Sequence, residues 1–391
     1  MARAETTSRQ AIQSMRAVGS VLGTNYTFLH LAQAQLMRGH IREANALFRE
    51  ASMMAEDNFG AESSLKALCS TFMAHWCYVH GDMEAAGKLI ESSFQTTDGW
   101  VDVFVSGYEV RARLAFARGG IADAIDVISE AVRTARDRHL DRLGAIAAAW
   151  RVEFLALAGH VRDARREAQA AGVFAAAALR GPPDFNWRPR LASTIAIARL
   201  HIAAGETAQA LLLLNTASAE FRNGDLTLCA YRLDALATIA LNRRGDIDEA
   251  IGRLQSLLEF VVAEGASGLL IEQGSGLVSL LHVIQRKNHE LVVSGMQRDV
   301  VANVLATLQR QHLSTQSGFS ARELDVLREL CHGRSNKSIG QMLDLSENTV
   351  KFHLKRIFRK LGADSRAGAI AAALQRNLVD LGEAPKKPIR P

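Results

Sequence analysis

Proline is scarce in this sequence and is confined to two places. The 391 residues include six prolines, which are Pro182, Pro183, Pro189, Pro385, Pro388 and Pro391. The long stretches outside these groups are rich in alanine, leucine and arginine, which favour helices. Period-two runs of valine, isoleucine and threonine, which mark half-buried strands, are also scarce. Together these two shortages predict an all-α fold.

The sequence also lacks clustered cysteines and long apolar runs. Its four cysteines are scattered along the chain, as is usual in a reducing cytoplasm: Cys69, Cys77, Cys229 and Cys331. No apolar run reaches the ~18 residues of a membrane span. The polar first nine residues lack the apolar segment of a signal peptide. We therefore expect a cytoplasmic protein of two or three domains, with no membrane partner.

Positive charge is unevenly distributed along the chain. The formal net charge is +5, yet residues 319–378 alone hold eleven Lys/Arg and six Asp/Glu, a net of +5. The last thirteen residues add +1, so residues 1–318 carry 32 basic and 33 acidic side chains. A concentrated basic stripe is typical of nucleic-acid binding, although a solvated helix face has the same composition. The charge therefore directs attention to the carboxyl-terminal region.

A glycine followed five residues later by an alanine recurs six times. The pairs, with successive glycines 38 to 46 residues apart, are Gly39/Ala44, Gly81/Ala86, Gly119/Ala124, Gly159/Ala164, Gly205/Ala210 and Gly245/Ala250. Each glycine follows a helical stretch, where it can adopt the left-handed conformation that ends a helix. Four residues after each alanine lies an apolar residue on the same helix face: Phe48, Ile90, Ile128, Ala168, Leu214 and Leu254.

This periodicity predicts helix–turn–helix units stacked as a solenoid. The pattern resembles the tetratricopeptide-like superhelix, with units longer than the usual ~34 residues. We expect the solenoid to occupy residues 1–311, with a proline-containing loop between its fourth and fifth units. The polar segment 312–318 has the composition of a linker.

Residues 319–378 are predicted to form four short helices, followed by a polar tail at 379–391 that we expect to be disordered. Ser320 and Glu323 have the spacing of a capping box for the first helix. The predicted apolar positions of the first three helices are Leu324, Leu327, Leu330, Ile339, Met342, Leu343, Val350, Leu354, Ile357 and Leu361. The short second helix, a tight turn and the basic third helix have the order of a helix-turn-helix motif.

The third helix has the size and the side chains to enter a DNA major groove. Asn, Lys and Arg side chains can bond to base edges, and Phe352 can contact a thymine methyl. Other polar residues lie near helix N-termini, where phosphate oxygens bind. The predicted DNA-binding residues are Ser335, Asn336, Lys337, Ser346, Asn348, Thr349, Lys351, Phe352, His353, Lys355, Arg356 and Arg359.

The spacing of this region resembles that of the LuxR-type (NarL-type) DNA-binding domain. The matching residues are Phe319-Ser320-x-Arg322-Glu323, Val326-Leu327, Gly333-x-Ser335-Asn336-Lys337-x-Ile339, Leu343-x-Leu345-Ser346, Thr349-Val350-Lys351-x-His353, Ile357, Lys360-Leu361 and Ser365-Arg366. The resemblance implies that Lys351, Phe352 and Lys355 face bases, and that Thr349 and His353 support the fold and backbone contacts. It also implies dimerisation through the fourth helix, with a face made by Ala367, Ile370, Ala371 and Leu374.

Two positions depart from the LuxR-type pattern. Ser338 stands where an acid is common, and Gly340 stands where alanine is usual. A glycine inside a helix weakens it by about 1 kcal/mol, so Gly340 is expected to weaken the second helix.

The solenoid in turn resembles the superhelix of large ATP-dependent LuxR-type regulators, the maltose-regulon-activator family. That resemblance implies that the superhelix binds an inducer and passes the signal to the DNA-binding domain. The phosphate loop of those regulators has no counterpart here, because the string from Gly81 to Leu89 has the wrong spacing and lacks a Ser/Thr after Lys88. We therefore expect no nucleotide or other cofactor.

Other functional classes have weaker support in the sequence. His75 and Cys77 lie about 200° apart on a helix, so a buried cysteine and a partly exposed histidine are favoured over a metal site. Trp76, Trp100, Trp150 and Trp187 are large core residues first, although they could line a ligand groove. No spacing of a catalytic site is present, so no enzyme is expected.

The prediction is thus a sequence-specific DNA-binding regulator that senses an effector or partner through its solenoid. It would bind double-stranded DNA as a homodimer, with RNA polymerase as a further candidate partner. The alternative is an interaction scaffold with a vestigial DNA-binding domain. A vestige would have no reason to keep Lys351 and Lys355 on an outward face, which favours the regulator.

Overall fold

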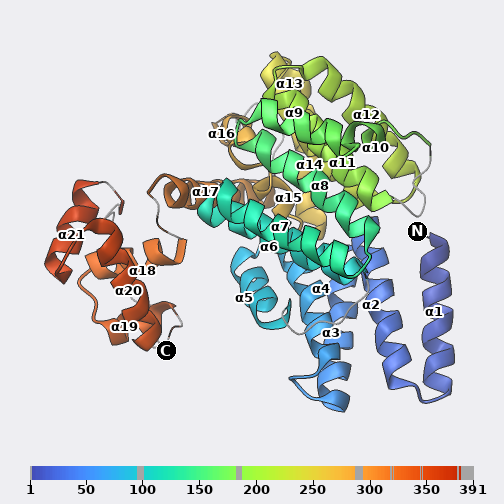
Figure 1. Cartoon of the computed structure of the whole chain (residues 1–391), viewed down its shortest axis with the longest axis horizontal. Coiled ribbons are helices and arrows are strands. Elements are labelled where there is room, and N and C mark those ends of the chain that lie inside the picture. Colours follow the sequence, from blue (N-terminus) through green and yellow to red (C-terminus); the bar gives the residue numbers. More distant parts are fainter. Residues whose placement is uncertain are drawn as a thin grey trace. The chain divides into compact units, whose positions relative to one another are not determined.

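The computed structural model describes residues 2–94, 101–181, 187–286, 294–317, 319, 321–343, 345, 347–376 and 378–379. These residues form helices and connecting turns, and no strand occurs among them (Figure 1). The all-α prediction is therefore confirmed. Within the described ranges, no helix combines the length and the apolar character that crossing a bilayer requires.

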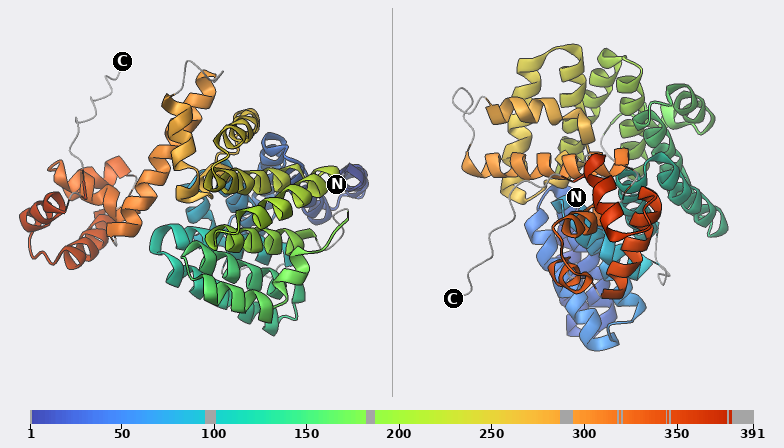
Figure 2. Two further views of the ribbon diagram at one scale, coloured as in Figure 1. Left: turned by 90° about the horizontal axis from the view of Figure 1, so that it is seen from above. Right: turned by 90° about the vertical axis from the view of Figure 1, so that its left-hand side faces the viewer.

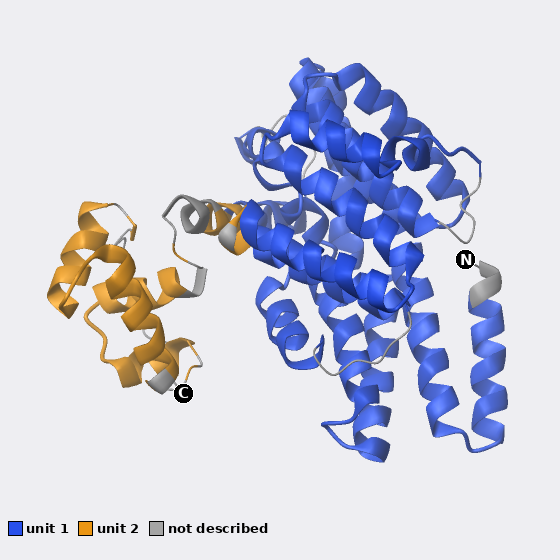
Figure 3. Ribbon diagram, viewed as in Figure 1, with its two compact units in different colours: residues 1–116, 121–305 blue, residues 117–120, 306–391 orange. Residues whose placement is uncertain are grey.

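The chain divides into two compact units (Figure 3). Unit 1 comprises residues 1–116 and 121–305, and unit 2 comprises residues 117–120 and 306–391. The helices from the amino terminus are α1 (Ala2–Ala17), α2 (Val21–Arg38), α3 (Ile41–Phe59), α4 (Ser64–His80), α5 (Met83–Ser93), α6 (Val101–Gly119), α7 (Ile121–Asp137), α8 (Asp141–Leu157), α9 (Val161–Ala170), α10 (Val173–Ala177), α11 (Trp187–Ala203), α12 (Thr207–Asn223), α13 (Thr227–Arg244), α14 (Ile247–Glu264), α15 (Gly268–Ile271) and α16 (Val278–Arg286). Within unit 1, helices that follow one another in the chain pack against each other (Figure 2).

The predicted repeat defines the helix pairs of unit 1. All six repeat alanines are fully buried, and each apolar residue four positions later is at most 3% exposed. Gly39, Gly81 and Gly245 end their helices in the left-handed conformation, with φ of 89°, 101° and 96°. A methyl-sized side chain on one helix thus lets its paired helix approach closely, as the sequence pattern predicts.

Two details of the repeat differ from the prediction. In the third unit the left-handed residue is Gly120, with φ of 81°, while Gly119 is still the last residue of α6. Two glycines in succession allow the helix to run one residue further before it ends. Pro189 lies in the first turn of α11, where a missing N–H costs nothing, rather than in a loop. The remainder of the predicted loop, 182–186, lies outside the described residues.

The first and last helix pairs of unit 1 contact each other, so the superhelix closes on itself. Arg38 Nε donates to Asp225 Oδ2 at 2.7 Å, and the Ile41 amide donates to Glu264 Oε2 at 2.9 Å. Helix α2 also packs on α13, and α4 packs on α15. The periodicity did not predict this closure, because it describes only neighbouring repeats.

The junction between α4 and α15 is made by close backbone contacts. Ser267 Oγ donates to the His80 carbonyl at 2.5 Å, and His80 Nδ1 lies 2.7 Å from the Gly265 carbonyl. A Cβ atom on Gly268 would lie 2.0 Å from the Tyr78 carbonyl oxygen. Only glycine therefore allows this approach without movement of the backbone.

Unit 2 contains the end of α17 (Gly295–Ser317) and four short helices: α18 (Ala321–Cys331), α19 (Asn336–Leu343), α20 (Glu347–Leu361) and α21 (Arg366–Gln375). The segment predicted as a linker is helical through Ser317, because no glycine or proline interrupts it before Gly318. The predicted tail lies outside the described residues from Asp380 onward.

Candidate nucleic-acid interface

Helices α19 and α20 form the predicted helix-turn-helix, and a close backbone contact sets the turn between them. The Leu345 amide donates to the Gly340 carbonyl at 2.8 Å. A Cβ atom on Gly340 would lie 2.6 Å from the Leu345 carbonyl oxygen. The expectation that Gly340 only weakens the helix is therefore incomplete: glycine leaves room for the turn that α20 follows.

The inner face of α20 fixes its orientation in unit 2. Val350 and Ile357 are fully buried, and Leu354 and Leu361 are 6% and 4% exposed. They pack with Leu327 and other apolar side chains of α18, and with Ala369 and Ala373 of α21. Met342, predicted as apolar core, is instead 52% exposed, because Ile339 and Leu343 provide the inner face of the short α19. Burial of the inner face leaves the opposite face of α20 exposed.

The outer face of α20 carries predicted DNA-binding side chains. Lys351, Phe352, Lys355, Arg356 and Arg359 are all exposed. The Arg356 guanidinium lies 5.8 Å from the centre of the Phe352 ring. An aromatic ring flanked by cations combines apolar contact with charge-assisted hydrogen bonding, which suits both base edges and phosphates.

An acidic residue that the sequence analysis did not single out also lies on this face. Glu347 Oε1 is 2.8 Å from Lys351 Nζ, one helical turn away. The hydrogen bond from Lys351 lowers the pKa of Glu347 below its usual value. The two side chains therefore form an exposed pair at the amino-terminal end of α20.

A buried carboxylate joins α18 to α20. Glu323 is 1% exposed, and its Oε2 lies 2.5 Å from Lys360 Nζ. Its Oε1 lies 3.4 Å from Arg356 Nε. The predicted capping partner, Ser320, lies outside the described residues. Lys360 thus belongs to the internal structure of unit 2 rather than to the DNA-facing set.

The remaining predicted site residues gather around the amino-terminal ends of α19 and α20. Ser335 caps α19 by accepting from the Ser338 amide at 3.2 Å, and Asn336 Oδ1 accepts from Arg366 at 3.2 Å. Lys337 is exposed, whereas Thr349 and His353 are partly buried. Ser346 and the side chain of Asn348 lie outside the described part of the chain.

Arg366 was not assigned a function from the sequence. It comes from the start of α21, and its guanidinium bonds both Asn336 Oδ1 and the Arg334 carbonyl. Arg366 therefore orients the amino-terminal end of α19, where Asn336 stands. In the sequence, the one feature that pointed to Arg366 was the Ser365-Arg366 pair, which matches the LuxR-type pattern.

The alternative sites of unit 1 have simple structural roles. Gly81 ends α4, and Lys88 lies within α5 with its Nζ 3.2 Å from Glu84, so this segment forms no phosphate loop. His75 is 4% exposed rather than partly exposed, because α4 is packed from several sides. Among the residues that the structure describes, no group of three or more His, Cys, Asp or Glu side chains has metal-binding geometry.

Comparisons with known proteins match both parts of the chain. Residues 1–287 match the family described as "MalT-like TPR region", and residues 317–373 match "Bacterial regulatory proteins, luxR family". The nitrate/nitrite response regulator protein NarP of Escherichia coli is 49% identical over 59 residues, which are 15% of this chain and 27% of NarP.

Two further relatives match a longer part of this chain than the helix-turn-helix. The HTH-type transcriptional regulator MalT of Vibrio parahaemolyticus is 26% identical over 206 residues, covering 47% of this chain and 22% of MalT. The probable transcriptional regulatory protein NarL of Mycobacterium tuberculosis is 28% identical over 118 residues, covering 30% of this chain and 53% of NarL. The matched part of this chain thus spans between 22% and 53% of the length of these relatives.

The repeats of unit 1 and the helix-turn-helix of unit 2 therefore agree with both family matches. Helical pairs with buried alanines account for the first match, and the buried inner face and cationic outer face of α20 account for the second. The chain belongs to the MalT-like tetratricopeptide family and carries a LuxR-type helix-turn-helix domain near its carboxyl end.

Proposed function

We propose that this chain is a sequence-specific DNA-binding transcriptional regulator rather than an enzyme. The observation that carries the proposal is the outer face of α20, where exposed cations and Phe352 oppose fully buried Val350 and Ile357. A helix held from one side and cationic on the other is suited to the major groove. The relatives named above are regulators, which supports the same class.

The proposed contacts divide into two sets. Lys351, Phe352 and Lys355 contact base edges, with Asn348 beside them. Phosphate oxygens are contacted from helix N-termini and from the ends of α20 by Ser335, Asn336, Lys337, Ser346, Thr349, Arg356 and Arg359. His353, which is partly buried, supports the backbone contacts. Base contacts specify sequence, whereas phosphate contacts set register and provide most of the salt-dependent affinity.

A homodimer on a pseudo-palindromic site completes the proposal, because one small helix-turn-helix contacts few base pairs. The α21 face offers Ala367, Ala371 and Leu374, which are exposed, and Ile370, which is partly buried. RNA polymerase is the proposed downstream partner. The protein would act in the cytoplasm, where DNA and RNA polymerase meet.

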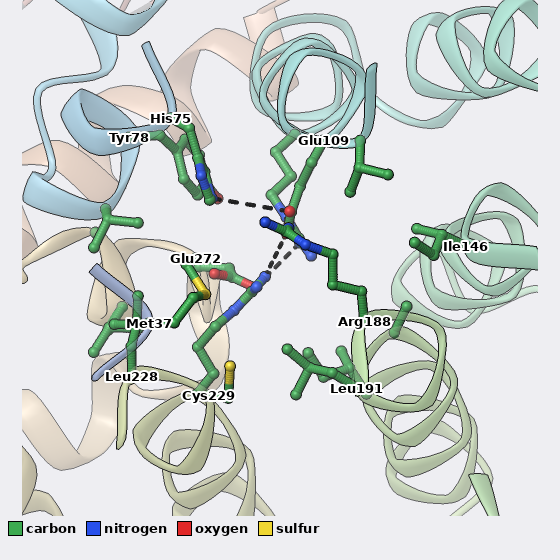
Figure 4. A pocket seen from close by; sticks show the side chains of 18 of the residues that line it. Met37, His75, Tyr78, Glu109, Ile146, Arg188, Leu191, Leu228, Cys229 and Glu272 are labelled. Atoms are coloured by element: carbon green, nitrogen blue, oxygen red, sulfur yellow. Dashed lines mark hydrogen bonds and ion pairs between the residues drawn. The ribbon is translucent and has the colours of Figure 1, made fainter. Parts of the chain in front are cut away.

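We propose a separate function for each predicted domain. Residues 1–311 sense an effector or partner, residues 312–318 connect, and residues 319–378 bind DNA. A pocket lined by early and late repeats of unit 1 (Figure 4) supports the sensing function of the solenoid.

The proposal is tested by DNA binding of the full chain. Sites are located by genome-wide binding mapping, and affinity for a mapped site and a scrambled duplex is then measured between 50 and 300 mM salt. Each neutralised phosphate should contribute about −0.9 to the slope of log K against log salt, and the mapped site should bind on the order of 10³-fold more tightly. Absence of binding at the lowest salt would favour the scaffold alternative instead.

A further inference from the structure

Glu347 is the one acidic residue of the cationic helix α20. It is the first residue of the helix, and its side chain is 48% exposed. The basic residues of the same helix are Lys351, Lys355, Arg356, Arg359 and Lys360. Phosphates repel a carboxylate on a surface that faces DNA, so a carboxylate there is favourable only where it accepts a hydrogen bond from a base. The position of Glu347 on α20 therefore decides what it can contact.

Glu347 shares one side of α20 with two lysines of the proposed base-contacting set. Lys351 follows it by four positions and Lys355 by eight. Residues four apart in a helix are displaced by only about 40° around its axis, so the three side chains lie within about 80° of arc. All three are exposed, whereas Val350 and Ile357 are fully buried. A helix that presents Lys351 to base edges thus also presents Glu347 to them.

The ion pair between Glu347 and Lys351 keeps part of its hydrogen-bonding capacity. Glu347 Oε1 lies 2.8 Å from Lys351 Nζ. The hydrogen bond from Lys351 and, to a smaller extent, the charge of Lys337 lower the pKa of Glu347, so the carboxylate is ionised at neutral pH. An ammonium group has three donors and a carboxylate has two accepting oxygens, so one bond between them leaves two donors and one oxygen. The pair can therefore contact a base pair without separating.

The edges of the base pairs limit what a carboxylate can contact in the major groove. The donors there are the amino groups at cytosine N4 and adenine N6, and the other polar atoms are acceptors. Lysine prefers guanine, which accepts at both O6 and N7, and glutamate prefers the amino group of cytosine. One C·G pair presents these acceptors and this donor side by side. It therefore complements an ammonium and a carboxylate that are already in contact.

A helix-stabilising function of Glu347 is the alternative explanation for an acid at this position. A carboxylate in the first turn interacts favourably with the partial positive charge of a helix N-terminus. That contribution is the same whichever base pair lies beside α20. Loss of Glu347 would then weaken binding to every duplex alike, whereas loss of a base contact would change the preference at one position.

We propose that Glu347 and Lys351 act as one unit that reads a single C·G base pair of the DNA site. Lys351 donates to guanine O6 and N7, and Glu347 accepts from cytosine N4 of the same pair. The ion pair between the two side chains stays intact in the complex. This inference rests on the proposed DNA-binding function and deepens it, because it makes Glu347 a residue that determines specificity.

The test is selection of bound duplexes from a randomised DNA pool by the full chain, followed by sequencing. The unmodified chain, Glu347→Ala and Lys351→Ala are compared. We expect the unmodified chain to prefer a C·G pair at one position of each half-site by about 5- to 150-fold, the range of one good base contact. Each variant should reduce that preference by about fivefold or more at this same position, and should keep the preferences elsewhere.

Affinity for the selected duplex and for a scrambled duplex provides a second readout. Glu347→Ala should bind the selected duplex more weakly and the scrambled duplex at least as tightly, because a negative charge is removed from the neighbourhood of the phosphates. Glu84→Ala in α5 is the matched control, since Glu84 lies 3.2 Å from Lys88 in the same one-turn spacing. It should change neither affinity. Circular dichroism checks that each variant is folded.

Three results of the selection would overturn the proposal: an unchanged base preference in Glu347→Ala, loss of a preference for an A·T pair in place of a C·G pair, and effects of the two variants at different positions. Equal weakening of both duplexes by Glu347→Ala would also overturn it, in favour of the helix-stabilising function. Each of these results keeps the regulator proposal, because the chain still selects DNA. Absence of selection by the unmodified chain would instead remove both proposals.

Discussion

Lys351 is exposed and has a defined partner, which makes its proposed contribution to DNA binding measurable. Its side chain is 57% exposed and pairs with Glu347 at 2.8 Å. We expect Lys351→Ala to weaken binding to the mapped site by about 1–3 kcal/mol, because a base contact is lost. Binding to scrambled DNA should change much less. Titration of both duplexes at one salt concentration measures the difference.

A matched control for Lys351 exists in α5. Lys88 pairs with Glu84 at 3.2 Å in the same one-turn spacing and is similarly exposed. Lys88→Ala should leave both affinities unchanged. If Lys351→Ala weakened the two duplexes equally, its contact would be to phosphate and not to a base.

Gly340 provides a second test at the scale of one residue. Helix propensity alone predicts that Gly340→Ala stabilises α19 by about 1 kcal/mol. The short distance to the Leu345 carbonyl predicts the opposite, a loss of about 1–3 kcal/mol, because the turn must move to admit a methyl group. Urea unfolding followed by circular dichroism gives the sign. Gly144→Ala, where the nearest atom would be 3.7 Å away, is the control and should be stabilising.

Sequence reasoning at this scale succeeded where a residue's function is local. It identified Val350, Leu354 and Ile357 as buried and Lys351 and Phe352 as exposed, because helix periodicity separates the two faces. It did not find the pairing of Glu323 with Lys360, since these residues are 37 positions apart. Pairing of that kind depends on how α18 packs on α20, which periodicity does not describe.

At the scale of the element, the helix pairs could be predicted but their closure could not. Repeated glycines mark helix ends, and repeated alanines mark the faces where paired helices touch. The contact between Arg38 and Asp225 joins residues 187 positions apart, and no local sequence pattern predicts it. From the sequence, a pocket inside unit 1 could be anticipated only because tryptophans can line a groove. Trp150 and Trp187 do line this pocket, whereas Trp100 lies outside the described residues.

Gly268 tests the closure directly. Gly268→Ala places a methyl group against the Tyr78 carbonyl, so we expect α15 to move away from α4 and unit 1 to lose about 1–3 kcal/mol or more. Hydrogen exchange should then rise in α4 and α15 above the change elsewhere. Gly252→Ala in α14, which meets open space, should instead stabilise the chain slightly. Equal exchange in both variants would show that the junction is not strained by the added methyl.

The whole molecule should lose stability in acid because of its buried charges. Burial lowers the pKa of His75 to about 4, against the opposing pull of Glu109. Between pH 6.5 and 4 the unfolded chain therefore binds a proton that the folded chain does not, and stability falls as the pH falls. Below pH 4.5 the lowered pKa values of Glu109 and Glu272 act in the same direction.

The expected decrease from His75 alone is about 1 kcal/mol per pH unit between pH 6 and 4.5. Urea unfolding at several pH values measures the free energy of unfolding, and His75→Gln should flatten the curve in that interval. A free energy that stayed constant from pH 7 to 4.5 in the unmodified chain would contradict the buried, neutral state of this histidine.

Contact between the earliest and latest repeats changes how a disturbance travels through unit 1. In an open array, a shift in the first pair reaches the last only by passing through every pair between them. Here hydrogen bonds join distant stretches of the chain directly. Arg38 donates to Asp225, and Ser267 donates to the His80 carbonyl. A structural change in the first repeats can therefore act directly on α13 and α15, without passing through the repeats between them.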